Sequence, residues 1–245
     1  MRKVRFRDAT GIERTGRWPV DEQITAGGKT YDPDAVTFLP PSEPTKVICQ
    51  AGGYMDHREE SGFEDRPERP ELFMKGPNTV IAHGDAIELP PDRDSVEFEA
   101  EFAIVIAKQC RAVSETEAME YVEGYTCVND ISNRDDQNEE RNWVRGKAFD
   151  GSLPMGPVLA TPDEVPDDAT LKLRHNGEVK QETTTGHMIF DVPELVADVS
   201  ELITLEPGDV IATGTPYGPD ELSPGDTVEV EFEGVGVLRN DVVER

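Results

Sequence analysis

Cysteine is scarce in this chain, and no motif pairs the few that occur. Cys49, Cys110 and Cys127 are an odd number without C-x-x-C spacing, which argues against both a disulfide framework and a thiolate metal site. The chain also lacks long apolar runs. Its first residues contain no apolar segment of an export signal, and no stretch approaches the roughly 18 apolar residues of a membrane span. We therefore expect a cytoplasmic protein in a reducing compartment, without a membrane partner.

Positive charge is also in short supply. Lys and Arg number 24 against 51 Asp and Glu, which gives a formal net charge of -27. Such a chain repels nucleic-acid phosphates and anionic lipid headgroups, so we expect no nucleic-acid partner. The acidic residues are spread through the sequence, as in 91–101, 133–141 and 161–168, which indicates an acidic surface coat. This coat suits molar salt, where the Debye length is about 3 Å at 1 M. We expect a haloarchaeal source; the alternative is an acidic mesophilic protein.

Short apolar segments separated by Gly and Pro turns predict a fold that is mostly β with some α. Residues 1–45 are typical of a small amino-terminal β domain, and the prolines of 40–44 form a natural linker to a larger domain, 46–245. In that domain we predict strands at 98–107, 170–177, 209–214, 227–234 and 235–240. Helical spacing predicts helices over 114–125 and 192–203, the first starting with a Ser114–Glu117 capping box.

Acidic residues occur where the chain begins to be buried. Glu97, Glu99 and Glu101 alternate before an apolar run, so on one strand their carboxylates would share a face, about 6 to 7 Å apart for each pair. Because burial of charge requires compensation, at least Glu101 favours a bound cation. Asp130 follows another apolar stretch and would complete an oxygen-rich site for Mg²⁺ or Mn²⁺. The alternatives are a solvent-facing strand edge for the glutamates and a turn or cap for Asp130.

Two further patterns are typical of catalysis. Lys147 is one of only eight lysines, and an ammonium beside a metal can stabilise a developing oxyanion. His57 and Glu60 are three residues apart, so on a helical turn the carboxylate would orient the imidazole as a general base. By themselves, a lysine is often a solvated surface residue and an H-x-x-E pattern is common.

Taken together, these motifs resemble the fumarylacetoacetate hydrolase family, particularly its short acylpyruvase and oxaloacetate decarboxylase-like branch. The matching segments follow the family's order and cover nearly all of residues 46 to 240; they include GGYMDHREE, EFEAEFAIVI, VNDISNRDDQ, WVRGKAFDGSLPMGP and LEPGDVIATGTPYG. The resemblance implies a catalytic domain built on a rolled mixed β-sheet, a small amino-terminal β domain, and a homodimer.

The resemblance also implies roles for individual residues. Glu99, Glu101 and Asp130 would hold Mg²⁺ or Mn²⁺, whereas Glu97 falls outside the match. The substrate carbonyl would be polarised by Arg134, Gln137 and Lys147. Thr215 would contact the substrate carboxylate, and His57 with Glu60 would activate water on a loop that closes over the site. Three positions depart from the family pattern, namely Gly53, Asn133 and Tyr217.

The chemistry implied is that of a small 2-oxo acid. Its carboxylate and keto oxygens chelate the metal, so electrons released on C–C cleavage flow into a metal-held enolate. We expect hydrolysis of a 2,4-dioxo acid such as an acylpyruvate or fumarylpyruvate. Oxaloacetate decarboxylation and isomerisation of 2-hydroxyhepta-2,4-diene-1,7-dioate use the same centre and remain alternatives. A non-enzymatic alternative is a metal- or carboxylate-binding protein whose site has decayed.

Overall fold

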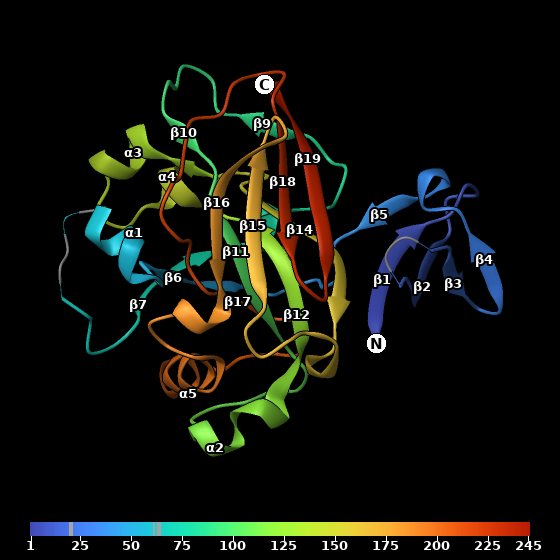
Figure 1. The fold of residues 1–245 in the computed structure, drawn as a ribbon, viewed down its shortest axis with the longest axis horizontal. Coiled ribbons are helices and arrows are strands. Elements are labelled where there is room, and N and C mark those ends of the chain that lie inside the picture. Colours follow the sequence, from blue (N-terminus) through green and yellow to red (C-terminus); the bar gives the residue numbers. More distant parts are fainter. Residues whose placement is uncertain (20–21, 61, 63–64) are drawn as a thin grey trace.

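Strands dominate the structure, a computed structural model that describes residues 1–19, 22–60, 62 and 65–245 (Figure 1). Short helices flank the strands or connect them. The predicted class, mostly β with some α, is therefore confirmed. None of the helices within these described ranges is long and apolar enough to cross a membrane.

The large sheet runs through the whole molecule. Its strands are, in spatial order, β4 (Lys29–Tyr31), β3 (Ile24–Ala26), β2 (Glu13–Arg17), β1 (Arg2–Arg7), β14 (Leu153–Ala160), β12 (Val122–Asn129), β11 (Ala100–Ile106), β17 (Val210–Ala212), β6 (Val47–Ala51) and β7 (Glu71–Lys75), with β5 (Thr37–Leu39) beside β1 and β8 (Val80–Ile81) beside β14. Most pairs are antiparallel, but β17–β6 and β14–β8 are parallel. The sheet is thus mixed.

A second sheet packs against the middle of the first. It contains β16 (Glu178–Thr184), β15 (Thr170–His175), β18 (Thr227–Phe232), β19 (Gly236–Glu244) and β9 (Ile87–Leu89), while β10 (Val96–Glu97) pairs separately with β13 (Ser132–Asn133). The main core fills the space between the sheets, where Phe102 of β11 stacks on Phe232 of β18. A smaller cluster covers the opposite face of β11. Because both faces are covered, β11 is continuously apolar after Glu101.

The helices are short. They are α1 (Met55–Glu60), α2 (Glu115–Ala118), α3 (Arg134–Glu139), α4 (Val144–Lys147) and α5 (Val192–Leu202), with 3₁₀ helices η1 (Pro33–Ala35), η2 (Pro77–Thr79), η3 (Met119–Tyr121), η4 (Pro162–Glu164) and η5 (Thr185–His187). The predicted helix 192–203 is confirmed as α5, which begins with a capping box between Asp191 and Glu194. The Ser114–Glu117 capping box is also present.

The predicted helix 114–125 is wrong beyond Tyr121. From Val122 the chain is strand β12, which is hydrogen-bonded to β11 on one side and β14 on the other. Hydrogen bonding of β12 to a buried strand on each side outweighs the local helical pattern. Intrinsic helix and strand propensities are weak, because they differ between most residue types by less than about 1 kcal/mol per residue.

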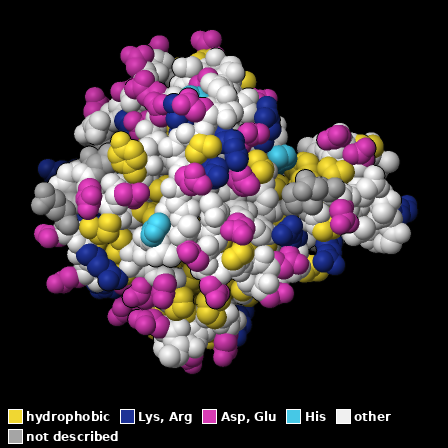
Figure 2. Space-filling model, viewed as in Figure 1, with side chains coloured by type: hydrophobic (Ala, Val, Ile, Leu, Met, Phe, Trp, Pro, Cys, Tyr) yellow, Lys and Arg dark blue, Asp and Glu magenta, His cyan; other side chains and the backbone are white. Residues whose placement is uncertain are grey.

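The amino-terminal strands, blue in Figure 1, lie to one side of the main body. They join the large sheet through β1, whose Arg2 and Lys3 pair with Ala160 and Leu159 of β14. The domain boundary between residues 45 and 46 stays a prediction. On the face shown in Figure 2, Asp and Glu side chains are scattered over the whole surface, as the spread of acidic residues along the sequence predicts.

Strand directions gather several chain ends at one edge of the large sheet. Because β12 and β17 run antiparallel to β11, both end where β11 begins. β6 is parallel to β17, so it ends at the same edge, and antiparallel β7 begins there. Polar residues at these ends are therefore brought together although they are far apart in the sequence.

Candidate metal centre and active site

Three buried carboxylates converge at this edge. Glu99 immediately precedes β11, Glu101 is its second residue, and Asp130 directly follows β12. One ligand atom from each lies within 4.8 Å of the others. The backbone fixes this arrangement: the Asp130 amide donates to the Glu99 carbonyl at 2.8 Å, and the Gly214 amide donates to a Glu101 carboxylate oxygen at 2.7 Å.

The predicted alternation of three glutamates along one strand is only partly right. The chain leaves β10 after Glu97 and enters β11 at Ala100, so Glu97 and Glu99 do not belong to one continuous strand. Glu97 instead accepts a hydrogen bond from Arg134 Nε at 2.6 Å. A local pairing of β10 with β13 breaks the strand, and it separates Glu97 from the carboxylate cluster.

Two buried lysines compensate the cluster. Lys147, at the end of α4, donates from Nζ to Glu99 at 2.7 Å and to Asp130 at 2.8 Å. Lys75, at the end of β7, lies 2.7 Å from the other Asp130 oxygen and donates to the Ser152 carbonyl at 2.9 Å. No role is predicted for Lys75 from the sequence. The available signal was a lysine directly after the apolar residues 72–74 of β7.

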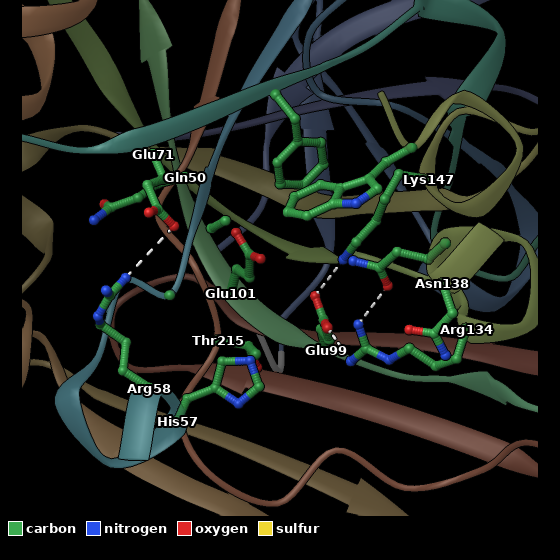
Figure 3. A pocket seen from close by; sticks show the side chains of 15 residues that line it. Gln50, His57, Arg58, Glu71, Glu99, Glu101, Arg134, Asn138, Lys147 and Thr215 are labelled. Atoms are coloured by element: carbon green, nitrogen blue, oxygen red, sulfur yellow. Dashed lines mark hydrogen bonds and ion pairs between the residues drawn. The ribbon is translucent and has the colours of Figure 1, made fainter. Parts of the chain in front are cut away.

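Arg134 and Gln137 lie on α3 and line the same cavity as Lys147. Besides its bond to Glu97, Arg134 contacts Glu99 and donates from Nη1 to the Gln137 side-chain oxygen at 2.7 Å. Figure 3 shows Lys147 and Arg134 approaching Glu99 from the same side. Both cations therefore lie beside Glu99 and line the cavity.

These contacts move the pKa values in opposite directions. Burial raises the pKa of Glu101 well above its usual range, and the charges of Asp130 and Glu99 raise it further. Burial acts on Glu99 in the same sense, but Lys147 and Arg134 outweigh it and hold the pKa of Glu99 below its usual value. Burial lowers the pKa of Lys147, whereas Asp130 and Glu99 raise it by more, so Lys147 stays protonated. Glu101 is thus the carboxyl whose charge is least compensated by the protein.

The donor set fits a hard divalent cation. Mg²⁺ and Mn²⁺ prefer carboxylate oxygens and water over sulfur and imidazole, and all three residues offer carboxylates. A cation among them would also supply the positive charge that Glu101 lacks. The predicted set Glu99, Glu101 and Asp130 is therefore brought together in a geometry compatible with a metal site.

His57 and Thr215 line the same cavity of about 320 Å³. His57 lies on α1. Thr215 follows β17 and accepts a hydrogen bond from Gln181 of β16 at 2.9 Å, a contact that the sequence did not reveal. Glu60 ends α1, but its side chain lies outside the described residues.

The three departures from the family pattern have distinct surroundings. A Cβ at Gly53 would lie 2.0 Å from the Thr213 carbonyl oxygen, so glycine lets the two loops pack tightly. Asn133 caps α3, with its amide nitrogen 2.6 Å from Asp136. Tyr217 is 59% exposed and is not among the described residues that line the cavity.

Comparison with known proteins gives one family and several activities. Residues 46–243 match the sequence model of the family described as "Fumarylacetoacetate (FAA) hydrolase C-terminal". The chain is 41% identical over 219 residues to the mitochondrial oxaloacetate tautomerase Fahd2a of Rattus norvegicus, which covers 85% of this chain and 70% of that protein. The chain is thus similar to a protein named for an isomerisation of a 2-oxo diacid.

Two solved structures share the whole fold. The 5-carboxymethyl-2-hydroxymuconate delta-isomerase from Mycobacterium smegmatis has 36% sequence identity and a TM-score of 0.90, covering 100% of this chain and 99% of that chain. The maleylpyruvate hydrolase from Sphingobium sp. SYK-6, solved with manganese(II) and pyruvate, has 27% identity and a TM-score of 0.84 with the same coverage. Isomerase and hydrolase chemistry thus occur on the architecture described above.

Proposed function

Since this chain belongs to the fumarylacetoacetate hydrolase family, we propose that it is a divalent-metal-dependent hydrolase that cleaves a C–C bond in a 2,4-dioxo acid. The observation that carries this proposal is a single cavity lined by two of the clustered carboxylates, Glu99 and Glu101, together with Lys147 and His57. These groups correspond to a metal site, an oxyanion stabiliser and a base, the minimum set for metal-assisted hydrolysis.

In this proposal Glu99, Glu101 and Asp130 hold Mg²⁺ or Mn²⁺. When bound, the ion supplies Lewis-acid stabilisation to the negative charge that develops on the 2-oxo group. The solved maleylpyruvate hydrolase, with its manganese(II) and pyruvate, supports both the choice of ion and the choice of product.

The protein's own side chains bind the substrate and move its protons. Lys147 and Arg134 place positive charge beside the 2-oxo acid head, and Gln137 orients Arg134 through its hydrogen bond. Thr215 donates its hydroxyl proton to the substrate carboxylate while Gln181 fixes its oxygen. One ring nitrogen of His57 takes a proton from the attacking water. That Glu60 orients the ring stays a prediction from the family resemblance. Cleavage then releases pyruvate and the acid derived from the distal acyl group.

A second candidate is isomerisation of an enol to its 2-oxo form. The names of the Rattus norvegicus tautomerase and of the Mycobacterium smegmatis isomerase favour it. It needs the same stabilised enolate and one group that carries a proton, but no attacking water. His57 supplies that proton transfer as well.

The test is pyruvate release from acetylpyruvate, fumarylpyruvate and oxaloacetate, with Mg²⁺ or Mn²⁺ in about 2 M KCl to screen the acidic surface. Wild type is compared with His57→Ala, Glu101→Ala and, as a matched control, the exposed His187→Ala. We expect turnover of a diketo acid, a loss of roughly 10²-fold or more in His57→Ala, near-complete loss in Glu101→Ala, and little change in His187→Ala.

Two other results of this experiment would indicate a different function. If enol–keto exchange of oxaloacetate is catalysed but no diketo acid is cleaved, isomerisation replaces hydrolysis as the function. If nothing turns over while metal still binds through Glu101, the protein is a binding protein and the catalytic proposal is wrong.

We also propose that the chain forms a homodimer. The mass in solution, measured by light scattering at high and low KCl, is expected to be twice the 27.1 kDa of one chain at high salt. Self-repulsion of the net charge of -27 should weaken the dimer at low salt.

A further inference from the structure

One wall of the cavity contains a buried side-chain amide, that of Gln50, to which the proposed function gives no role. We propose that Gln50 is a specificity-determining residue that hydrogen-bonds a hydroxyl on the fourth carbon of the ligand, so that the site prefers a hydroxyl there over an alkyl group or a carboxylate. This inference rests on the proposed function, because the 2-oxo acid head must bind at the carboxylate cluster for the fourth carbon to reach Gln50.

Gln50 is buried, and the protein does not satisfy its side chain. It lies on β6, lines the cavity and is 2% exposed. Within the described part of the chain, neither its amide nitrogen nor its amide oxygen has a hydrogen-bond partner. An apolar residue would serve the fold better, because a buried polar group without a partner is destabilising. A ligand group in the cavity that donates or accepts a hydrogen bond would satisfy this amide.

Strand pairing sets the distance between Gln50 and the carboxylate cluster. β17 lies between β6 and β11, and its Ala212 pairs with Cys49 on one side and with Ala103 on the other. Neighbouring strands are about 4.8 Å apart, so the backbones of β6 and β11 are roughly 10 Å apart. Figure 3 shows Glu101 between Gln50 and the far side of the cavity. A short ligand held at the cluster by its carboxylate and 2-oxo group can therefore span this gap with its next two carbons.

The charges near Gln50 favour a neutral ligand group. Arg58 also lines the cavity, but it forms an ion pair with Glu71, whose Oε2 lies 3.6 Å from Arg58 Nη1. Glu71 lines the cavity as well, so one positive and one negative side chain face this end. Toward the cluster, burial and neighbouring carboxylates raise the pKa of Glu101. A ligand carboxylate beside Gln50 would therefore add negative charge where the protein compensates it least.

A hydroxyl matches this amide better than an alkyl group or a carboxylate does. It can accept a hydrogen bond from Nε2 of Gln50 or donate one to Oε1. An ionised carboxylate only accepts, so it cannot satisfy Oε1, and an alkyl group satisfies neither atom. A site that hydrogen-bonds a ligand hydroxyl rejects the analogue without it, because the buried partner is then left unpaired. The enol form of a 2,4-dioxo acid can carry such a hydroxyl, which links this preference to the proposed substrate.

The experiment measures binding rather than turnover. Dissociation constants with Mn²⁺-loaded protein at fixed ionic strength are compared for three ligands that differ only in the group on the fourth carbon. They are 4-hydroxy-2-oxobutanoate, 2-oxopentanoate and 2-oxoglutarate, which carry a hydroxyl, a methyl group and a carboxylate there. Wild type should bind the hydroxyl ligand about tenfold more tightly than the methyl ligand, equivalent to about 1.4 kcal/mol, and more tightly than the carboxylate ligand.

Variants locate the effect. Gln50→Met and Gln50→Leu both remove the polar atoms, in an unbranched and a branched side chain, so each should bind the hydroxyl and methyl ligands about equally. Gln109→Leu is the matched control, because Gln109 is an exposed glutamine that pairs with Glu206, and it should keep the preference for the hydroxyl. Glu71→Gln removes a counterion of Arg58, so it should strengthen binding of the carboxylate ligand and leave the hydroxyl-over-methyl preference unchanged.

The outcomes separate the Gln50 contact from the function on which it rests. Equal binding of the hydroxyl and methyl ligands by wild type, or a preference that both Gln50 variants keep, overturns the contact while the metal centre stands. Tighter binding of 2-oxoglutarate than of the hydroxyl ligand by wild type overturns it too. These comparisons on wild type do not depend on the folding of any variant. If none of the three ligands binds the metal-loaded protein, the proposed function fails and the contact fails with it.

Discussion

The two ends of the cavity handle buried polar groups in different ways. At one end, Glu99 and Asp130 are matched by Lys147 and Lys75, and most polar atoms have a partner at hydrogen-bonding distance. At the other end, the side-chain amide of Gln50 is buried and has no hydrogen-bond partner among the described residues. The first end is thus organised by ion pairs within the protein, whereas the second contains a buried amide that the described residues leave unsatisfied.

The ion pairs at the first end agree with the role proposed for the carboxylate cluster. Groups that stabilise charge during a reaction work best when they are fixed in advance.

The largest expected effect comes from removing one of the lysine counterions of the carboxylate cluster. Lys75→Met removes one counterion of buried Asp130, and loss of one partner of a buried pair costs about 3 to 5 kcal/mol. Urea unfolding measures this loss, and Lys172→Met, which breaks a surface pair with Glu182, should change stability by less than about 1 kcal/mol. Equal stability of wild type and Lys75→Met would contradict the assigned compensation.

A smaller effect concerns Glu101, the carboxyl of the cluster whose negative charge is least compensated by the protein. Because burial and neighbouring charges raise its folded pKa above the usual 4.5, its contribution to stability is present below that value and is lost as pH rises through the folded pKa. Metal-free Glu101→Gln should therefore become more stable than wild type as pH increases from about 4.5, by roughly 1 to 3 kcal/mol.

Thermal unfolding across pH, with and without Mn²⁺, measures this difference. Added Mn²⁺ should stabilise wild type and leave Glu101→Gln unchanged. A difference between the two proteins that does not depend on pH would show that Glu101 is not the titrating group.

The smallest effect concerns the buried amide of Gln50 at the other end of the cavity. Gln50→Leu removes an unsatisfied buried amide and should raise the free energy of unfolding by about 1 kcal/mol. Gln181→Leu is the matched control, because Gln181 is equally buried but donates to Thr215 and Pro216, so its replacement should be destabilising. Urea unfolding of both variants decides the question, and a destabilised Gln50→Leu would mean that Gln50 has a structural role.

Local sequence patterns correctly predicted the helices and strands that are specified by their own residues. The α5 helix carries its own cap and an apolar stripe, and the apolar run after Glu101 identified a strand covered on both faces. The helix predicted over 114–125 failed where β12 begins, because its strand character comes from pairing with β11 and β14. The prediction for Glu97 failed for the same reason. Glu97 lies on β10, which pairs with β13, so it does not share a strand with Glu101.

For the site, residue type and motif order predicted which side chains gather at the cavity. Glu99, Glu101, Lys147, Arg134, Gln137, His57 and Thr215 all line it, and Asp130 joins the carboxylate cluster. Lys75, Gln50 and Arg58 were missed because lysine, glutamine and arginine are usually surface residues. Only their burial distinguishes them, and burial is not a property of the local sequence.

The sequence by itself determined the family, the acidic character and the chemical inventory, because these depend on residue type and order alone. Only the tertiary structure decided which charges meet. The start of β11 and the ends of β12, β17 and β6 converge through strand pairing, so groups from residue 50 to residue 215 share one cavity. Electrostatic energies depend on distance and burial in that cavity, and neither quantity exists before the chain has folded.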